Sequence, residues 1–340
     1  MSRTFDVAVV GATGAVGETM LEILHARDFP IGEIHAVASE RSAGKRVAFG
    51  GRQLVVKDIA TFNFSTVQVG LFSPGAQVSL EYAPKAAAAG CVVIDNTSAF
   101  RYDDDKPLIV PEVNAHAISR YKATNIIANP NCSTIQMLVA LKPLHDAFGI
   151  ERVNVCTYQA VSGTGKEAIE ELGKQTARLL NGLDVTAKVY PRQIAFNCLP
   201  HIDDFQENGY TKEEMKMVWE TARILEDDSI RVNPTCVRVP VFYGHSEAVH
   251  IETREPINEK SARELLESAP GVVVMDERTD GGYPTAVTES AGTDAVYVGR
   301  IRKDISTERG LNLWVVSDNV RKGAALNSVQ IAECLVRDHL

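Results

Sequence analysis

Cys132 is the residue whose type and setting most clearly allow chemistry. It lies in the segment Asn129-Pro-Asn-Cys-Ser-Thr134, where a proline and an asparagine end an apolar strand and an apolar helical pattern follows. Ser133 and Thr134 are predicted to cap that helix, which places Cys132 in its first turn. There the helix dipole and the free backbone N–H groups lower the pKa of a thiol, so Cys132 is predicted to be a nucleophile.

Most of the other cysteines are better explained as small buried side chains. Four of them lie inside apolar segments: Cys91, Cys156, Cys236 and Cys334. The six cysteines form no Cys-x-x-Cys pair and no cluster with histidine, so neither a zinc site nor a disulfide framework is indicated. We therefore expect no metal and a reduced, cytoplasmic compartment.

Thiolate chemistry on a carbonyl group also needs an acid or base, and histidine titrates near neutral pH. His245 stands in Tyr243-Gly-His-Ser, close to an apolar strand. The alternative for this residue is a hydrogen-bonded structural histidine. From the local sequence alone, both interpretations stay open.

A glycine-rich turn near the start of the chain indicates a dinucleotide. Gly11-Ala-Thr-Gly-Ala-Val-Gly17 directly follows a predicted strand and opens a predicted helix. Glycines allow the tight turn and let backbone N–H groups approach a pyrophosphate at the helix N-terminus. A turn without a ligand is the alternative, but the setting favours a cofactor. The predicted contacts are Gly11, Thr13, Gly14, Ala15, Val16 and Gly17.

The end of the second strand bears on the choice between NAD and NADP. An acidic side chain there binds the ribose hydroxyl of NAD, whereas an arginine accommodates the 2′-phosphate of NADP. Glu40 and Arg41 are both present, followed by Ser42. Neighbouring side chains at a strand end point in opposite directions, so only one of the two is expected to face the ribose.

The composition excludes several functional classes. The chain has 340 residues, of which 45% are hydrophobic, and its 35 basic and 44 acidic residues give a net charge of -9. Without a basic run, nucleic acid is not an expected partner. No apolar run reaches the roughly 18 residues of a membrane helix, so no membrane association is expected. Met1–Val10 is interpreted as a first strand and not as a signal peptide.

Short apolar strands alternate with helical patterns in the first part of the chain. The predicted strands are Phe5–Val10, Ile34–Ser39, Val67–Phe72, Cys91–Asn96 and Thr124–Asn129; the predicted helices are Val16–Ala26 and one that ends at Gly90. This β-α-β rhythm predicts an α/β fold with a parallel, doubly wound, Rossmann-type sheet.

The pattern changes after about residue 133. The later strands are longer and partly alternating, as in a mixed sheet covered on one side: Arg152–Val161, Val237–Arg254, Gly271–Met275, Thr293–Lys303 and Leu311–Ser317. Helices are predicted near 166–181, 211–226, 258–268 and 324–339. We predict a dinucleotide-binding domain of residues 1–133 plus 320–340, and an α+β catalytic and dimerisation domain of residues 134–319.

These motifs together resemble aspartate-semialdehyde dehydrogenase. The resemblance runs in order along nearly the whole chain. Besides 11–17 and 129–134, it includes Ser98-Ala-Phe-Arg101, Gln159-Ala-Val-Ser-Gly163, Glu213-Glu-Met-Lys216, Arg238-Val-Pro, Gly244-His-Ser-Glu247 and Asp318-Asn-Val-Arg-Lys-Gly323. It implies reversible, NADP-dependent reduction of aspartyl phosphate to aspartate semialdehyde and inorganic phosphate, in lysine, threonine, methionine and diaminopimelate biosynthesis.

The resemblance also implies residue roles. Cys132 forms the thioester, His245 is the acid/base and Gln159 orients the substrate. Arg238 binds the substrate carboxylate through two parallel hydrogen bonds, and Glu213 binds its amino group. The resemblance further implies that phosphate is bound by Arg101, Asn131 and Lys216. It also implies that the cofactor contacts Ser162, Gly163 and Asn319. Without the resemblance, Glu213 and Lys216 would be interpreted as a solvated i,i+3 pair on a helix.

The same resemblance favours Arg41 and Ser42 as the NADP-selecting residues, and a homodimer or dimer of dimers. An enzymatic alternative is another acyl-phosphate reductase, such as N-acetyl-glutamyl-phosphate reductase. The Arg238 and Glu213 pair argues against it, because an acetylated amine has no use for Glu213. A non-catalytic paralogue that binds dinucleotide would be expected to lack Cys132 or His245, and both are present.

Overall fold

The computed structural model describes residues 3–340, and Met1 and Ser2 lie outside the description. The chain forms two compact units. Unit 1 contains the chain up to Pro130 together with Ala324–Leu340, and unit 2 contains Asn131–Gly323. The boundaries therefore fall a few residues from those predicted, and Cys132 belongs to unit 2. The reason is that the helix beginning at Cys132 packs on the strands of unit 2.

Unit 1 is built on a six-stranded parallel sheet, as predicted for a doubly wound fold. Its strands are β1 (Phe5–Val10), β2 (Ile31–Ala38), β5 (Lys57–Asp58), β6 (Val69–Phe72), β7 (Val92–Asp95) and β8 (Ile126–Ala128). They lie in the order β5-β2-β1-β6-β7-β8, with every pair parallel. The strand order reverses between β1 and β6, and ligands of such sheets bind at this switch point.

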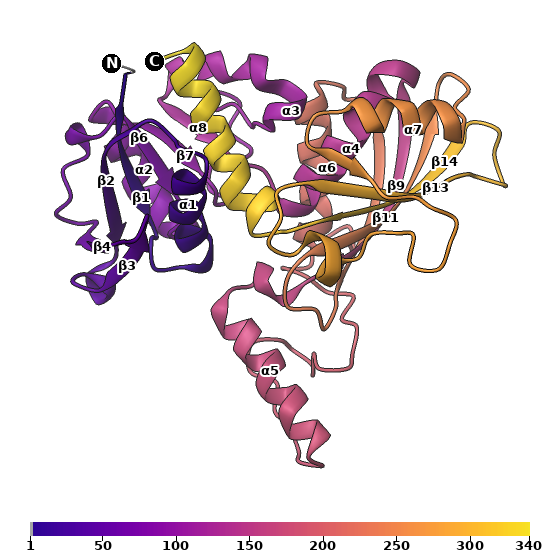
Figure 1. Cartoon of the computed structure of the whole chain (residues 1–340), viewed down its shortest axis with the longest axis horizontal. Coiled ribbons are helices and arrows are strands. Elements are labelled where there is room, and N and C mark those ends of the chain that lie inside the picture. Colours follow the sequence, from indigo (N-terminus) through magenta and orange to yellow (C-terminus); the bar gives the residue numbers. More distant parts are fainter. Residues whose placement is uncertain (1–2) are drawn as a thin grey trace. The chain divides into compact units, whose positions relative to one another are not determined.

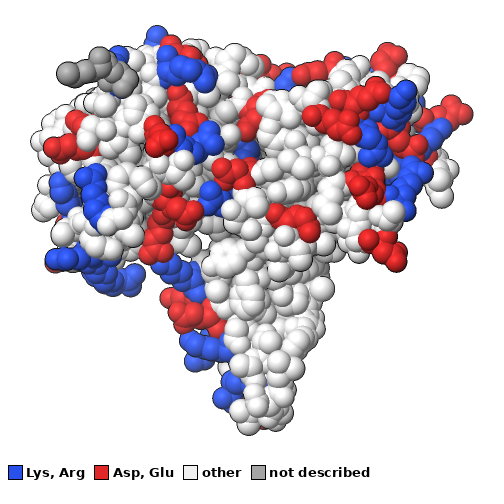
Figure 2. Space-filling view, in the orientation of Figure 1, with Lys and Arg blue, Asp and Glu red and all other residues white. Residues whose placement is uncertain are grey.

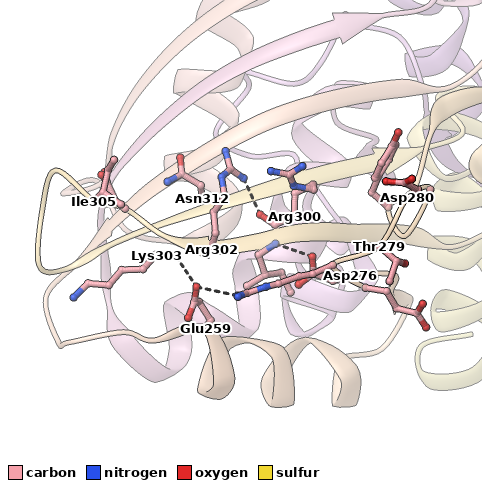
Figure 3. A pocket seen from close by; sticks show the side chains of 15 residues that line it. Glu259, Asp276, Thr279, Asp280, Arg300, Arg302, Lys303, Ile305 and Asn312 are labelled. Carbon is pink, nitrogen blue, oxygen red and sulfur yellow. Dashed lines mark hydrogen bonds and ion pairs between the residues drawn. The ribbon is translucent and has the colours of Figure 1, made fainter.

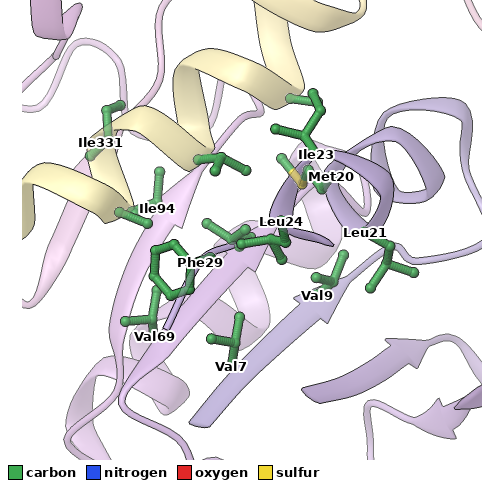
Figure 4. Close-up of a cluster of buried hydrophobic side chains, with 14 of the residues drawn as sticks. Val7, Val9, Met20, Leu21, Ile23, Leu24, Phe29, Val69, Ile94 and Ile331 are labelled. Carbon is green, nitrogen blue, oxygen red and sulfur yellow. The ribbon is translucent and has the colours of Figure 1, made fainter. Parts of the chain in front are cut away.

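The core of unit 1 lies between the sheet and two helices, α1 (Ala15–Ala26) and α8 (Leu326–Asp338). Figure 4 shows Met20, Leu24 and Ile331 from these helices packed near Val9 and Ile94 of the strands. The apolar side chains recur at helical spacing, so each helix buries one face. Burial of this stripe anchors the turn between β1 and α1, which carries the glycine motif.

Several elements of unit 1 were not predicted. A hairpin of β3 (Arg46–Phe49) and β4 (Arg52–Val55) follows β2. The helix that was predicted to end at Gly90 is present as α2 (Ala76–Ala88), which joins β6 to β7. A short helix, α3 (Pro111–Asn114), precedes β8. The hairpin strands are short and largely exposed, so they give little hydrophobic signal in the sequence.

Unit 2 contains a six-stranded mixed sheet. Its strands are β9 (Ile150–Gln159), β10 (Arg231–Arg238), β11 (His245–Thr253), β12 (Val272–Val274), β13 (Val296–Lys303) and β14 (Gly310–Ser317), in the order β10-β9-β11-β14-β13-β12. The single strand predicted over 237–254 is wrong, because β10 ends at Arg238 and β11 begins at His245. Pro240 and Gly244, with φ of +87°, shape the intervening loop.

Three helices of unit 2 pack on this sheet: α4 (Cys132–Phe148), α6 (Lys212–Leu225) and α7 (Glu259–Ser268). Alternate residues of β11 are buried, whereas Ala248 and His250 between them are only partly buried. The sheet is therefore covered on one side, as predicted. A further helix, α5 (Lys166–Leu180), extends away from the sheet (Figure 1) and has a small core of its own.

Candidate active site

The N-terminus of α4 presents Cys132 as its first residue. The N-cap is Asn131, whose side-chain oxygen accepts hydrogen bonds from the backbone N–H of Ser133 at 3.0 Å and of Thr134 at 3.3 Å. The prediction that Ser133 and Thr134 cap this helix is therefore wrong. The carboxylate of Glu220 accepts the backbone N–H of Asn131 at 2.6 Å and so fixes the position of the N-cap residue. Cys132 itself is partly exposed at a rigidly capped helix end.

A glycine lies directly against Cys132. Gly323 belongs to a π-helical turn, Arg321–Ala325, that precedes α8. A Cβ atom at position 323 would lie only 2.7 Å from the Cβ of Cys132, closer than two such atoms can approach. The backbone of this turn can therefore lie so close to Cys132 only because residue 323 has no side chain.

His245 is the first residue of β11 and is fully buried. Its Nδ1 accepts the backbone N–H of Ala160 at 3.0 Å, so the proton of the neutral ring lies on Nε2. Burial and the charge of Arg238 lower the pKa of His245 to about 3. Gln159 places its amide nitrogen 3.5 Å from His245 Nε2. His245 is thus a neutral donor at Nε2.

Arg238 ends β10 beside the histidine. Its Nη1 donates to the carbonyl of Ala160 at 2.6 Å, and the side chain is buried. Among residues 3–340, no group accepts a hydrogen bond from its buried Nε. The ring of Tyr190 lies 6.0 Å from the guanidinium carbon. A buried guanidinium with a spare donor is suited to a ligand carboxylate.

Glu213 is the centre of a buried polar network on α6. One of its oxygens accepts from the side-chain amides of Gln159 and Asn131, at 3.0 Å each, and the other accepts from Lys216 at 2.9 Å. Burial alone would raise the pKa of Glu213, but Lys216 and these hydrogen bonds lower it to about 2. Lys216 also donates to Asp203 at 2.7 Å. Glu213 and Lys216 therefore form a buried pair and not a solvated one.

The start of α6 explains how this network is fixed. Thr211 and Glu214 form a capping box, in which each side chain accepts the backbone N–H of the other. Glu214 also accepts the Cys236 N–H of β10 at 3.0 Å. The helix is thereby tied to the strand that ends at Arg238.

Ser162, Gly163 and Asn319 lie together in unit 2. The side-chain oxygen of Asn319 accepts from the Ser162 hydroxyl at 3.1 Å and from the Gly244 N–H at 2.9 Å. A Cβ atom at Gly163 would lie 3.2 Å from Arg238 Nη1 and 3.6 Å from the His245 ring. The turn therefore passes immediately beside the histidine and the arginine.

The remaining predicted residues belong to unit 1. Arg101 is buried, and its Nη2 donates to the carbonyl of Asn96 at 3.1 Å.

Asn131 belongs to unit 2 and was predicted to bind phosphate together with Arg101 and Lys216. Its side-chain oxygen caps α4 and is therefore not available to a ligand. One N–H of its side-chain amide donates to Glu213 at 3.0 Å, so the other N–H is the donor that the amide can offer to a ligand.

The glycine motif forms a cradle between β1 and α1. Gly11 has a φ of +86°, and a Cβ there would lie 2.5 Å from the carbonyl oxygen of Ser73. A Cβ at Gly17 would lie 2.3 Å from the Gly11 oxygen. No side chain caps α1 at Gly14. The residues thus fit a pyrophosphate, because the helix N-terminus is open and its backbone is approachable.

The segment after β2, which bears on the choice between NAD and NADP, has a different conformation from the predicted one. Glu40–Ser42 form a 3-10 turn and not a strand end, so their side chains do not alternate. Ser42 is buried and its hydroxyl lies 3.4 Å from that of Thr13, which connects it to the glycine motif. Glu40 and Arg41 are both exposed.

A pocket elsewhere in unit 2 contains none of the predicted residues. It lies beside β13 and is lined by many charged residues, and several of them are bonded to other residues of the lining (Figure 3). Arg278 pairs with Glu259 at 3.3 Å, and Arg302 donates to the carbonyl of Arg300 at 2.7 Å. The residues that line this pocket include no cysteine and no histidine, so the pocket lacks the nucleophile and the acid/base of the site around Cys132.

Two further properties concern the described residues as a whole. Residues 3–340 contain no helix long and apolar enough to cross a membrane. None of the six cysteines, which all lie within these residues, forms a disulfide bond.

Comparison with known proteins agrees with both units. Residues 6–121 match the family described as semialdehyde dehydrogenase, NAD binding domain, and residues 141–322 match semialdehyde dehydrogenase, dimerisation domain. The aspartate-semialdehyde dehydrogenase of Shewanella violacea is 63% identical, with full coverage of both chains.

Solved structures give the same result. Aspartate semialdehyde dehydrogenase II of Vibrio cholerae, solved in complex with ASA, is 59% identical with a TM-score of 0.98 and full coverage of both chains. The Candida albicans enzyme, solved with NADP, is 27% identical with a TM-score of 0.76, over 98% of this chain and 99% of that one. The chain belongs to the aspartate-semialdehyde dehydrogenase family. It is a dinucleotide-dependent oxidoreductase that acts on an aldehyde group.

Some residues of the site were not found from the sequence. Glu220 and the backbone of Ala160 hold the cap and the histidine, but each acts on a residue far away in the chain. Gly323 ends the motif Asp318–Gly323, and its role becomes visible only through its contact with Cys132.

Proposed function

We propose that this enzyme interconverts aspartate semialdehyde and aspartyl phosphate, with Cys132 as the nucleophile and NADP as the redox cofactor. The observation that carries the proposal is the convergence in unit 2 of a capped helix N-terminus, a neutral buried histidine and a buried arginine with a spare donor. This reaction belongs to the synthesis of lysine, threonine, methionine and diaminopimelate from aspartate.

The reaction begins with attack of the Cys132 thiolate on the aldehyde carbon. The helix N-terminus stabilises the thiolate, and the carbonyl oxygen becomes an alkoxide. His245 carries its proton on Nε2 and can donate a hydrogen bond to that oxygen. When bound, NADP supplies the acceptor for a hydride. Loss of the hydride from carbon leaves an acyl thioester on Cys132.

Inorganic phosphate then resolves the thioester. A phosphate oxygen attacks the acyl carbon, the carbon–sulfur bond breaks, and Cys132 leaves as a thiolate while aspartyl phosphate forms. We assign Arg101, Lys216 and the amide of Asn131 to the phosphate. Lys216 is held by Glu213 and Asp203, which keep its charge in place and raise its pKa.

The substrate's own charges select Arg238 and Glu213. Arg238 can give its free Nε donor to the α-carboxylate, and Glu213 is ionised and can attract the ammonium group. Gln159 bonds to Glu213 and lies beside His245, so it can align the substrate between them. An acetylated amine would lose the attraction of Glu213, which favours aspartate semialdehyde over longer acyl phosphates.

For the cofactor, the glycine cradle and Thr13 and Ser42 lie in unit 1, and Ser162, Gly163 and Asn319 lie in unit 2. We assign the pyrophosphate to residues 11–17 and the 2′-phosphate to Arg41 and Ser42. Arg41 is exposed and its charge is available to a phosphate, whereas the carboxylate of Glu40 would repel one.

We also propose that two copies pair through the open face of the sheet in unit 2. Tyr158 and Trp314 lie there with ring centroids 5.6 Å apart, partly exposed. The arm around α5 adds the exposed apolar residues Leu180, Leu183 and Phe196. Figure 2 shows charged side chains along one edge of this arm, whereas most of its viewed face is uncharged. A dimer, with a dimer of dimers as the larger alternative, would cover these surfaces in a cytoplasmic enzyme.

The thioester can be tested by leaving out phosphate. The enzyme mixed with aspartate semialdehyde and NADP should form one equivalent of reduced cofactor per active site and an acylated protein detectable by mass spectrometry. Addition of phosphate should restore turnover. Cys132→Ala should bind NADP normally and show neither burst nor acylation. A burst in Cys132→Ala, or steady turnover without phosphate, would refute the assignment.

A further inference from the structure

Glu247 is a fully buried carboxyl group that takes no part in the proposed reaction. It lies on β11 two residues after His245, so both side chains point to the same side of the sheet. Its carboxyl group lies beside the hydroxyl of Ser133 and the amide of Gln136, both near the start of α4. Glu247 therefore lies behind the two residues that perform the chemistry.

The surroundings of Glu247 favour the uncharged acid. An ionised carboxylate without water requires a cation or several strong donors. The polar groups beside it are one hydroxyl and one amide, and burial raises its pKa well above the usual range of glutamate. A neutral carboxyl here also avoids a negative charge that would oppose the thiolate of Cys132.

A protonated carboxyl group completes a chain of hydrogen-bonding groups. The amide nitrogen of Gln136 donates to the carbonyl of His245 at 3.5 Å. The side-chain oxygen of Gln136, the hydroxyl of Ser133 and both oxygens of Glu247 are buried and have no hydrogen-bond partner within residues 3–340. An O–H on Glu247 can supply that donor, and its other oxygen can accept from Ser133, the neighbour of Cys132. In its protonated form, Glu247 can thus connect β11 at His245 with α4 at Cys132.

We propose that Glu247 is a positioning residue that fixes Cys132 and His245 relative to each other, acting through Ser133 and Gln136. The inference rests on the proposed function, in which Cys132 is the nucleophile. Glu247 does not touch the substrate. Its contribution is to kcat, through the geometry of the pair, and not to substrate affinity.

The test compares two substitutions at position 247. Glu247→Gln keeps the shape, one donor and one acceptor, so kcat should stay within about twofold of the wild-type value. Glu247→Leu removes the polar connection, so kcat should fall about tenfold or more while the KM for aspartate semialdehyde changes little. The rate of Cys132 alkylation by iodoacetamide against pH should shift only in Glu247→Leu. If that variant does not fold, Gln136→Met removes the same connection and should show the same split.

Thr253→Val is the matched control, because Thr253 is also fully buried and hydrogen-bonded but lies at the other end of β11. It should lower stability without changing kcat or alkylation. Equal damage from Glu247→Gln and Glu247→Leu would show that an ionised carboxylate matters and would overturn the proposal, as would full activity in Glu247→Leu or Gln136→Met. A normal phosphate-free burst that disappears in Cys132→Ala would leave the proposed function intact in those cases.

Discussion

Arg238 combines a fixed anchor with an unused donor. One nitrogen is bonded to Ala160, and the Nε of the same planar group remains available in a buried position. Lysine keeps the charge but cannot occupy both positions at once. In Arg238→Lys, the KM for aspartate semialdehyde should therefore rise about tenfold to hundredfold, the loss expected for a charge-assisted hydrogen bond. The KM for NADP should stay nearly constant. Steady-state kinetics with each substrate varied will decide, and an unchanged semialdehyde KM would assign Arg238 a structural role.

His245 predicts how stability depends on pH. Its pKa in the folded protein is about 3, below the ordinary value of 6.5. Between these two pH values, His245 is protonated in the unfolded chain but stays neutral in the folded protein. Stability should therefore fall as the pH falls from 6.5 towards 3, by at most about 1.4 kcal/mol per pH unit from this residue. Glu213 adds a similar loss only below pH 4.5, because its folded pKa is about 2.

Urea unfolding between pH 7 and pH 5 isolates the histidine. The free energy of unfolding should decline less steeply in His245→Gln than in the wild type. Other partly buried histidines, such as His35 and His145, contribute equally to both proteins and cancel in the comparison. Parallel curves would mean that His245 is protonated or exposed in the folded state.

Arg41 carries the prediction about cofactor preference. It is exposed in the 3-10 turn next to Ser42, whose hydroxyl lies near Thr13 of the glycine motif. Loss of one charge-assisted contact in Arg41→Ala should reduce kcat/KM for NADP about tenfold to hundredfold and leave that for NAD nearly unchanged. Glu40→Ala is the control, and it should not reduce the preference for NADP. A wild type that uses NAD better would instead assign the ribose to Glu40.

Single residues were predictable where their type is unusual for their setting. A cysteine at a helix start and a glycine-rich turn after a strand are visible in the sequence. Arg238 was assigned through the family resemblance, and its place at the end of β10 is visible only in the structure. Glu220 was not predictable, because its carboxylate acts on a segment far away in the chain and has no local motif. Glu247 belongs to the motif Gly244–Glu247, but its place beside Ser133 and Gln136 is visible only in the fold. Asn131 was assigned to phosphate, and its capping role appears only in the geometry of α4.

At the scale of elements, the π-helical turn before α8 limits what can stand beside the nucleophile. A methyl group at Gly323 would meet Cys132 at 2.7 Å, so the turn or the start of α4 must move. Gly323→Ala should lower kcat about tenfold or more, since small displacements of reacting groups are costly. It should also destabilise the protein by about 1–3 kcal/mol, as overpacking does.

Gly173 provides the comparison for that variant. It lies within α5, and a Cβ there would meet nothing within 4 Å. Gly173→Ala should leave kcat unchanged and slightly raise the melting temperature, because alanine favours a helix. Equal activity in Gly323→Ala and Gly173→Ala would show that the backbone near Cys132 yields without cost.

The parallel sheet of unit 1 was predictable because each strand is a continuous apolar run between helical patterns. Unit 2 was harder, since residues 237–254 look like one apolar stretch and are in fact β10, a loop and β11. The division matters for function, because it places Arg238 at the end of one strand and His245 at the start of the next.

At the scale of the whole molecule, the open face of the unit 2 sheet gives the last prediction. Ala248 lies on that face, opposite Trp314 on β14 and Cys156 on β9. If two copies pair there, Ala248→Glu puts a charge into an apolar interface, and an unpaired buried charge is strongly unfavourable. The wild type should sediment at about twice the 37.0 kDa of one chain, and Ala248→Glu should shift towards the monomer on dilution.

Lys260→Glu on α7 is the control, since it changes charge on an exposed helix that packs on the covered side of the sheet. It should leave the dimer intact. Activity adds a second measurement. Ala248 lies on the face of β11 opposite to His245, so any loss in Ala248→Glu should depend on protein concentration and recover where the dimer re-forms. A wild type that sediments as a monomer, or an Ala248→Glu dimer as tight as the wild type, would show that the subunits do not meet through this face.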